Sequence, residues 1–531
     1  MSPRACVGVL LLAHSALGFL SAGGTHLNRV RGAEGVPAAG TARASRVLTL
    51  GTSVRARQQL GTLRMTTPQA AEEKTAASAA ELFDVIVVGG GPAGLALSAH
   101  LGERGLKVLT CDPKLNDDWI PNYGVWIDEI DHLGLRSCLM TEWETATVFM
   151  GANSDEKITL KRPYGRMDRK RFKAHMLERC RKAGVRLEAV AAKEVTHGVA
   201  ESTLALGDAG GSSASAARCR LLVDCAGYSK AYVKFDQGKE PGVQAAYGIE
   251  ADIKPGSYPL PHEEMLLMDY RDAHMQDSPA DAAAAETVPT FIYCMPSSPS
   301  RVFFEETSLI ANPPVPFDEL KRRLHKRLEL WGTEVLAIHE EEFCYIPMGG
   351  AMPSVPQRVL GFGGAAGLVH PATGYMISRT MNLAASQAEA IERALANHPG
   401  DAEAAAHEVW NGLWTPKTLR QRDFANFGGE YLEEIGLSEL RDFFGSFFVL
   451  PFEQWGGFLS HRLVEPYDRL IFGLGVWANT SWRVRLSLAL KGFLSGPAGW
   501  LLLGRSVLPV DPDDDKRFPT PENRPEFFKK L

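Results

Sequence analysis

The sequence predicts an α/β protein with three parts: a Rossmann-like dinucleotide-binding domain, an antiparallel-sheet domain inserted into it, and a helical C-terminal region. Three observations support this prediction. A glycine-rich motif directly follows an apolar run near residue 85, short strand-like runs recur from 240 to 345, and Phe, Leu and Trp become frequent after residue 400. A chain of 531 residues is long enough for two or three domains.

The first 80 residues have the composition of a targeting region. Residues 6–22 are apolar and end in small residues, like the core of a signal peptide, whereas residues 25–65 are rich in Arg, Ala, Ser and Thr with Glu34 as the only acid. A signal-like segment before a transit-like one resembles the bipartite address of algal plastids bounded by extra membranes. The alternatives are an ordinary secreted protein or a membrane anchor, for which the apolar run is short.

A dinucleotide-binding unit is predicted to open the mature chain at residues 81–113. The apolar run 85–88 is typical of a strand buried on both faces, and Gly89, Gly91 and Gly94 satisfy G-x-G-x-x-G directly after it. The first glycine permits the tight turn, the second lets a pyrophosphate approach the backbone, and the third lets helix and strand pack closely. A structural glycine turn is the alternative interpretation.

The second half of this unit supplies an acid at the expected distance. A helix over 95–104 is closed by Gly105, a strand over 107–110 follows, and Asp112 lies just past its end, where a carboxylate can bind a ribose hydroxyl. The wording GGGPAG, at the start of the mature domain, resembles FAD-binding flavoproteins more than NAD dehydrogenases. We therefore expect FAD as the cofactor.

Two later segments fit a flavin site. The stretch 164–185 predicts a helix that begins near Asp168 and ends at Gly184. Many flavoproteins of this type place a similar Arg-led helix over the cofactor, so Arg169 is a candidate contact. The alternative is that the basic residues of this helix form a solvated face.

The second segment, RVLGFGGAAGLVHPATGYM at 358–376, reads as a strand, a glycine-rich turn and the start of a helix. It resembles the second flavin motif, in which backbone amides approach the cofactor, and the candidate positions are Gly363, Gly364 and Gly374. That motif usually carries an Asp where this chain has Gly364, so the contact of that Asp to the ribityl chain is missing here.

These segments define the expected domains. Residues 81–239 and 346–395 form the dinucleotide-binding domain, 240–345 form the inserted sheet domain, and 396–531 form the helical region. By composition, 208–219 and 272–286 are expected to be loops.

The helical region offers two interpretations. Residues 471–510 contain no Asp or Glu, and their only charged residues are basic ones among many aromatic and aliphatic side chains, which suits a position in a membrane interface. The alternative is a second helical core packed on the first domain. No run of 18 uninterrupted apolar residues occurs, so we do not expect a spanning helix.

Composition excludes several other classes. A formal net charge of −6 argues against a nucleic-acid-binding protein. The eight cysteines are scattered without CxxC spacing, so we expect reduced structural thiols and no metal site.

The run RVFFEETSLI at 301–310 places two carboxylates in a predicted strand. Carboxylates are rarely fully buried unless they are paired. Because successive side chains of a strand point to opposite faces, Glu305 shares a face with Phe303 and Thr307, and Glu306 lies on the other. Both could instead be structural acids, paired for example with Arg301 or Arg271.

The motifs together resemble the plant-type lycopene cyclases over about four fifths of the chain. They occur in one order, and the resemblance is carried by DVIVVGGGPAGLALSAHL, PNYGVWIDEIDHLGL, RPYGRMDRKRFK, VQAAYGIEADI, MDYRD, PTFIYCMP, FFEETSL, YIPMGGAMP and GLVHPATGYM. FFEET matches the family motif FLEET, with Phe304 in place of Leu as in the ε-type cyclases. YIPMGG, CDPK and RPYGR look more like the β-cyclases.

The resemblance implies a lycopene β-cyclase that converts the linear ends of lycopene, an apolar carotenoid, to β-rings by a proton-initiated reaction without net redox change. By motif position, Glu305 is the expected acid. Asp269 could stabilise the cation or act as base, or it could simply pair with Arg271. Reduced FAD is the implied cofactor, with NADPH as reductant.

The resemblance further implies a plastid location, peripheral on an internal membrane, with other carotenoid enzymes as possible partners. Four alternatives stay open: an ε-cyclase, a family member acting on epoxy-carotenoids (of the neoxanthin or capsanthin-capsorubin synthase type), a redox flavoenzyme such as a monooxygenase, and a non-catalytic flavin-binding membrane module.

Overall fold

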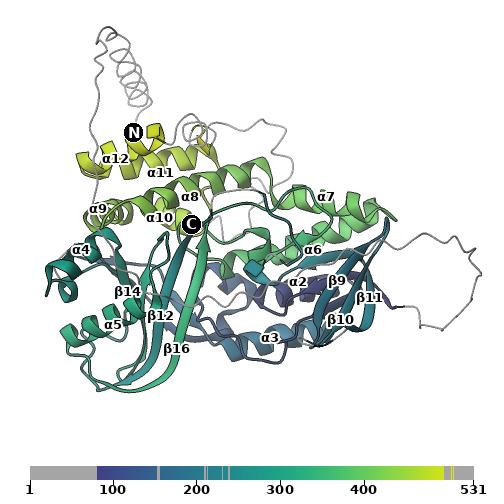
Figure 1. Cartoon of the computed structure of the whole chain (residues 1–531), viewed down its shortest axis with the longest axis horizontal. Coiled ribbons are helices and arrows are strands. Elements are labelled where there is room, and N and C mark those ends of the chain that lie inside the picture. Colours follow the sequence, from purple (N-terminus) through teal and green to yellow (C-terminus); the bar gives the residue numbers. More distant parts are fainter. Residues whose placement is uncertain are drawn as a thin grey trace, which may run out of the picture. The chain divides into compact units, whose positions relative to one another are not determined.

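The computed structural model describes residues 80–151, 156–208, 211, 213–229, 231–236, 240–494, 504 and 506–507. The predicted targeting region lies outside these residues, apart from residue 80, and so does much of the acid-free stretch near the C-terminus. The described residues form three sheets with helices packed around them (Figure 1).

The first sheet contains the predicted dinucleotide-binding unit. Its strands are β1 (Leu82–Val88), β2 (Val108–Cys111), β8 (Arg186–Glu188), β9 (Ala191–His197), β10 (Ser202–Gly207), β11 (Ser213–Asp224) and β17 (Leu360–Gly361). The order is β8-β2-β1-β11-β10-β9, and β17 also pairs with β11. Strands β8, β2, β1, β11 and β17 run parallel to one another. Strand β10 pairs antiparallel with β11 and with β9.

The loop predicted over 208–219 is wrong in its second half. Residues 213–219 belong to β11, which pairs with β1 on one side and β10 on the other. Pairing with β10 along 213–219, joined by β1 only from Arg218 onward, holds this Ser- and Ala-rich segment as a strand, so tertiary pairing outweighs its composition.

Four helices flank this sheet: α2 (Pro92–Glu103), α3 (Arg169–Lys182), α6 (Ile377–Asn397) and α7 (Ala402–Leu413). Helix α2 begins within the glycine motif, with Gly91 as its N-cap and Gly94 in its first turn. Helix α3 begins where predicted, because the Asp168 side chain accepts hydrogen bonds from the amides of Lys170 and Arg171. The strand, glycine turn and helix predicted over 358–376 are also present, as β17, η7 (Gly363–Ala366) and α6.

The second sheet is built from β5 (Ala146–Phe149), β6 (Lys157–Leu160), β12 (Gly242–Ile253), β13 (Met265–Asp269), β14 (Thr290–Ser298), β15 (Arg301–Ser308) and β16 (Val335–Met348). Its order is β16-β12-β15-β14-β13-β5-β6. The pairs are antiparallel except β13 with β5. Strands β5 and β6 come from within 81–239, so this sheet is not confined to 240–345.

Two helices cover one face of the second sheet, and neither was predicted. Helix α5 (Phe317–Trp331) buries Leu320, Leu324 and Leu328 against it. The loop predicted over 272–286 is wrong, because α4 (Pro279–Thr287) lies there. Its N-cap is Ser278, which accepts from the Asp281 amide, and its interior is a run of alanines, the best helix formers.

A third sheet, β3-β7-β4, lies next to the C-terminal helices. Its strands are β3 (Gly124–Trp126), β4 (Leu139–Trp143) and β7 (Tyr164–Met167). The helices are α8 (Pro416–Glu434), α9 (Leu437–Phe448), α10 (Phe452–Leu459), α11 (Pro466–Asn479) and α12 (Trp482–Leu494).

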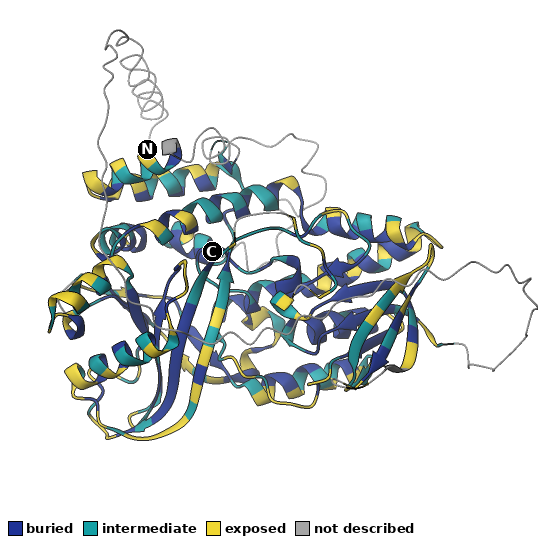
Figure 2. Ribbon diagram, in the orientation of Figure 1, coloured by how far each residue is buried: buried dark blue, intermediate teal, exposed yellow. Residues whose placement is uncertain are grey.

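An aromatic core joins β3, β7 and the second sheet to these helices, which confirms the helical prediction. Figure 2 shows buried residues on the strands of the second sheet and on the C-terminal helices. Within the described part of the chain, no helix is both long enough and apolar enough to cross a membrane.

Candidate active site

Strand β15 lies between β12 and β14, and its two faces meet different cores. Phe303 packs in the aromatic core shared with the C-terminal helices, whereas Phe304 packs in the core covered by α5. Glu305 and Glu306 therefore point to opposite faces, as strand geometry predicts.

Glu306 is fully buried in an ion pair. Its carboxylate accepts from Arg327 Nε at 2.9 Å and Nη2 at 3.1 Å, and from the Thr290 hydroxyl at 2.6 Å. Of the two arginines suggested from the sequence, Arg301 pairs with Glu250 and Asp252, and Arg271 pairs with Asp269. The structural partner of Glu306 is thus a residue of α5, a helix that the sequence analysis missed.

Asp269 lies on the Glu306 side of the sheet, because it pairs with Ile292, which in turn pairs with Glu306. It is completely buried and makes a bidentate ion pair with Arg271, the shortest contact being 2.6 Å. The structure thus agrees with the alternative of an Asp269–Arg271 pair and places Asp269 on the face opposite Glu305.

Glu305 lies in a row of paired residues that crosses four strands. Tyr293 of β14 and Gly248 of β12 are its direct partners, and Glu342 of β16 is the partner of Gly248. Directly paired residues present their side chains on the same face of a sheet. The row therefore brings a phenol and two carboxyl groups to one face.

The surroundings of Glu305 favour its protonated form. Burial raises the pKa of this carboxyl to about 8, with a further contribution from the charge of Glu342. Among the described residues, no side chain or amide donates a hydrogen bond to the Glu305 carboxyl. The residue nevertheless keeps part of its surface uncovered. A neutral carboxylic acid with an open side is suited to donating a proton to an apolar molecule.

Three tyrosine hydroxyls extend from Glu305 toward the C-terminal helices. Tyr164 of β7 contacts the Tyr293 hydroxyl at 3.1 Å and the Tyr375 hydroxyl at 3.4 Å. Burial raises the pKa of each phenol well above its usual value, so all three remain neutral. The Glu305 face thus meets uncharged, largely aromatic groups on this side.

On the other side, Glu342 is held by Asn122. Its carboxylate accepts from the Asn122 side-chain amide at 2.6 Å and from the Asn122 backbone amide at 3.3 Å. Arg166 of β7 fixes Asn122 through a 2.7 Å hydrogen bond, pairs with Glu250 at 2.7 Å, and lies over the Phe303 ring.

The glycine motif has room for a phosphate. A Cβ at Gly94 would stand 1.8 Å from the Gly89 carbonyl oxygen, so close packing of helix and strand requires glycine there. Gly89 has a φ of +113°, which other residues rarely adopt. At Gly91, by contrast, no atom from elsewhere in the fold lies within 4 Å of the place that a Cβ would occupy. The N-terminus of α2 is thus open to an anionic group, as a dinucleotide requires.

Of the other proposed cofactor residues, Asp112 lies against the glycine motif, Gly363 lies against α2, and Gly374 lies against the second sheet. Asp112 follows β2 and accepts from the amide of Gly90, at 2.6 Å, within the glycine motif. Gly363 and Gly364 lie in η7, where a Cβ at Gly363 would stand 2.6 Å from Ala93 of α2. Gly374 precedes α6, and a Cβ there would meet Gln244 of β12.

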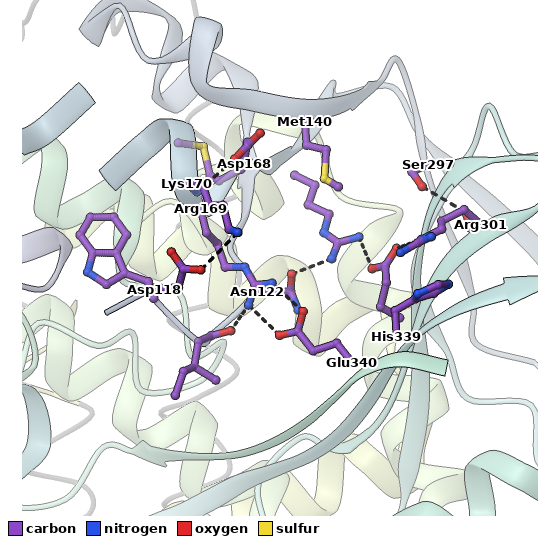
Figure 3. A pocket seen from close by; sticks show the side chains of 15 residues that line it. Asp118, Asn122, Met140, Asp168, Arg169, Lys170, Ser297, Arg301, His339 and Glu340 are labelled. Carbon is purple, nitrogen blue, oxygen red and sulfur yellow. Dashed lines mark hydrogen bonds and ion pairs between the residues drawn. The ribbon is translucent and has the colours of Figure 1, made fainter. Parts of the chain in front are cut away.

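Arg169 lies in a cavity of about 800 Å³ between α3 and the second sheet. It pairs with Glu340 at 2.7 Å and donates to the Ile120 carbonyl, and Figure 3 shows Arg169 and Glu340 pointing toward each other. The hydrogen bond to Glu340 raises the pKa of Arg169. Charged residues in ion pairs and the apolar side chains of Trp119, Ile120, Met140 and Met167 line the cavity together.

Sequence reasoning missed several residues around Glu305, although most lie in motifs already singled out. Asn122 belongs to PNYGVW, Tyr164 and Arg166 to RPYGR, Tyr293 to PTFIYCMP and Tyr375 to ATGYM. Glu342 is the exception, since it stands in a run of three glutamates that looks like an exposed strand edge.

Comparison with known proteins adds to this geometry. The model of a family described as lycopene cyclase protein matches residues 84–486. A chloroplastic lycopene beta cyclase of Arabidopsis thaliana is 40% identical over 418 residues, which cover 78% of this chain and 81% of that protein. A chromoplastic capsanthin/capsorubin synthase of Citrus sinensis is 40% identical over 383 residues, covering 72% of this chain and 74% of that protein.

Among solved structures, a geranylgeranyl bacteriochlorophyll reductase-like protein of Thermoplasma acidophilum has a similar fold. The TM-score is 0.56 at 16% sequence identity, and the match covers 77% of this chain and 99% of that one. This similarity supports the predicted α/β fold.

Proposed function

The chain belongs to the lycopene cyclase family, and on that premise we propose that it is a lycopene β-cyclase with Glu305 as the proton donor. The observation that supports this role most directly is the contrast within β15. Glu305 is desolvated, unpaired among the described residues and partly uncovered, whereas Glu306 is locked in an ion pair.

The proposed reaction begins with a proton. Glu305 donates it to C2 of the terminal C1=C2 bond, which leaves a tertiary cation at C1. The C5=C6 bond attacks this cation, and transfer of a proton from C6 to the carboxylate left on Glu305 completes a β-ring. One proton is gained and one is lost, so no electrons are exchanged. The neutral hydroxyls of Tyr164, Tyr293 and Tyr375 and the ring of Phe303 surround the reacting end without offering a competing base.

We propose that FAD binds at the glycine motif. The residues that would hold it are Gly89, Gly91, Gly94, Asp112, Arg169, Gly363, Gly364 and Gly374. In its reduced form, generated with NADPH, the flavin supplies negative charge that stabilises a nearby cation. The open space at Gly91 and the approach of Gly363 to Ala93 of α2 fit this cofactor.

The location we propose is the plastid, because relatives of similar length carry the description chloroplastic or chromoplastic. We further propose that the protein lies on a membrane surface there, since a wholly apolar C40 substrate resides in lipid. Other carotenoid enzymes would be its neighbours.

The C-terminal helices provide a surface for this contact. Exposed apolar side chains follow one stripe of α11 and one of α12, and they are Tyr467, Leu470, Leu474, Trp477, Trp482, Leu486 and Leu490. Helix α12 has no acidic residue, which suits an anionic lipid surface.

One experiment tests the proposed function. Residues 81–531 are expressed in bacteria that accumulate lycopene, and the pigments are separated by chromatography and identified by mass. We expect β-carotene. Products with ε-rings would indicate that the protein is a lycopene ε-cyclase. Oxygenated products formed with stoichiometric consumption of NADPH would indicate a redox flavoenzyme, and unchanged lycopene with bound FAD a non-catalytic module.

A further inference from the structure

The row that contains Glu305 holds a second carboxyl group. Glu305 of β15 and Glu342 of β16 both pair with Gly248 of the intervening strand β12. Both side chains therefore lie on one face, on either side of a residue that has none. The Phe303 ring covers Gly248, since its Cζ lies 2.7 Å from where a Cβ would stand. Between Glu305 and Glu342, β12 is thus covered by the Phe303 ring and not by a further polar side chain.

The two carboxyl groups have unequal hydrogen-bond partners. Glu342 accepts from the side-chain and backbone amides of Asn122, and Asn122 is itself held by Arg166. Donors of this kind stabilise a carboxylate over a carboxylic acid. Glu305 has no such donor among the described residues. When one proton is shared by this pair, it therefore resides on Glu305.

We propose that Glu342 is a positioning residue for the reaction: as a carboxylate fixed by Asn122, it keeps the proton of the pair on Glu305. This inference rests on the proposed function of Glu305 as the acid. It adds a residue that acts through Glu305 and does not touch the substrate. Two carboxyl groups that interact across a desolvated space lose their protons in two separated steps.

The electrostatics agree with this assignment. The charge of Glu342 raises the pKa of Glu305 in addition to burial, and burial raises the pKa of Glu342, opposed by the Asn122 hydrogen bonds and by the charge of Arg169. The other titratable or charged groups facing the pair come from β14, β7, β12, β16, α3 and the segments before β3 and α6. They are Tyr293, Tyr164, Arg166, Glu250, Glu340, Cys344, Arg169, Tyr123 and Tyr375.

The test is the pH profile of Glu342→Gln, measured as kcat/KM of the mature protein with lycopene in lipid vesicles, FAD and a reductant. The wild-type rate falls as Glu305 loses its proton. Removal of the Glu342 charge lowers the pKa of Glu305, so the alkaline limb moves to lower pH by about one unit or more. At a pH above both limbs the rate is then reduced about tenfold for each pH unit by which the limb moves, whereas at a pH below both limbs it stays near the wild-type rate.

Glu341→Gln is the matched control. Glu341 is the neighbouring residue on the opposite face, exposed and paired with Lys321 at 2.9 Å. The same chemical change there should leave the alkaline limb unmoved. An unmoved limb in a folded Glu342→Gln protein, or an equal displacement in Glu341→Gln, would overturn the proposal.

A second measurement does not depend on activity. Infrared titration of the isolated protein follows the carboxylic acid signal as the pH rises. We expect the signal that persists to about pH 8 to vanish in Glu305→Gln and to titrate at lower pH in Glu342→Gln. If it vanishes in Glu342→Gln instead, the proton resides on Glu342 and the inference is wrong. A wild-type protein that does not cyclise lycopene refutes the proposed function, while this titration still decides the inference.

Discussion

Glu305 and Glu306 are adjacent in sequence and chemically identical, but the sheet gives them different surroundings. Glu306 is matched by Arg327 and Thr290, whereas Glu305 faces aromatic groups and a second carboxyl group. The alternation of a strand is enough to separate a structural acid from a proposed catalytic one.

Activity should separate the two residues. We expect Glu305→Gln to lower the cyclisation rate by about 10² to 10⁴-fold with FAD still bound, because the amide keeps the shape of the side chain and cannot donate the proton. Glu306→Gln leaves Arg327 without its counter-ion, a loss of about 3–5 kcal/mol of folding free energy. Pigment yield, bound flavin and thermal unfolding of both variants check this. Near-normal cyclisation by Glu305→Gln would make the motif structural.

At alkaline pH, Glu305→Gln should be more stable than the wild type, although it is less active. The folded-state pKa of Glu305, about 8, is above its unfolded value of about 4.5, so the fold loses stability as the pH rises between these values. Each pH unit costs about 1.4 kcal/mol at most. Glu305→Gln removes this loss. We expect its melting temperature to equal that of the wild type near pH 4 and to exceed it above pH 8. Parallel melting curves at both pH values would contradict the raised pKa.

Residue-level prediction reached Glu305 but not Glu342. The two-residue period of a strand is local, so it assigned Glu305 and Glu306 to opposite faces. The proximity of Glu342 to Glu305 depends instead on the register of β16 against β12, which aligns both with Gly248. Register arises from long-range pairing, and a run of three glutamates gives no local sign of it.

At the scale of elements, the glycine motif was predicted with its strand, helix and second strand because each follows from local patterning. The helices α4 and α5 were missed within a region interpreted as strands and loops. The alanines of α4 and the leucine spacing of α5 both favour helix. These two local signals predict the helices better than the strand-like runs on either side of them.

The turn before α2 allows a clean test of cofactor binding. A Cβ at Gly91 would meet no atom from elsewhere in the fold within 4 Å, so Gly91→Val should leave the fold intact and fill the space that a pyrophosphate needs. We expect loss of bound flavin and a melting temperature close to that of the flavin-free wild type, because flavin binding itself stabilises the fold. Gly428→Val in α8, also free of contacts, is the control and should retain flavin. Stoichiometric FAD in Gly91→Val would refute the assignment.

Helices α11 and α12 allow a test of membrane contact. Trp482→Glu combined with Leu486→Glu replaces two exposed apolar side chains, 71% and 50% accessible, on one stripe of α12. Loss of their burial in lipid should weaken binding to vesicles of phosphatidylglycerol and phosphatidylcholine by at least about tenfold. Val199→Glu, on an equally exposed site of the first sheet's hairpin, is the control. Undiminished cosedimentation of the double variant would exclude this surface.

At the scale of the whole molecule, the division into domains was harder to predict than the fold class. The expected insertion at 240–345 is the longest part of the second sheet, but β5 and β6 join it from a segment between the first sheet and α3. Short strands that cross between sheets carry no sequence mark of their destination, because partner choice is decided by packing.

The position of β17 has a consequence for biosynthesis. This strand joins β11 of the first sheet only after all strands of the second sheet have left the ribosome, and η7 and α6 follow it. The first sheet therefore lacks β17 and the glycine turn η7 during most of translation. Because β11 and β17 are far apart in the chain, their pairing slows folding. A chain of which only the first two thirds have been made therefore lacks the strand and the turn that complete the first sheet, and this sheet closes late in synthesis.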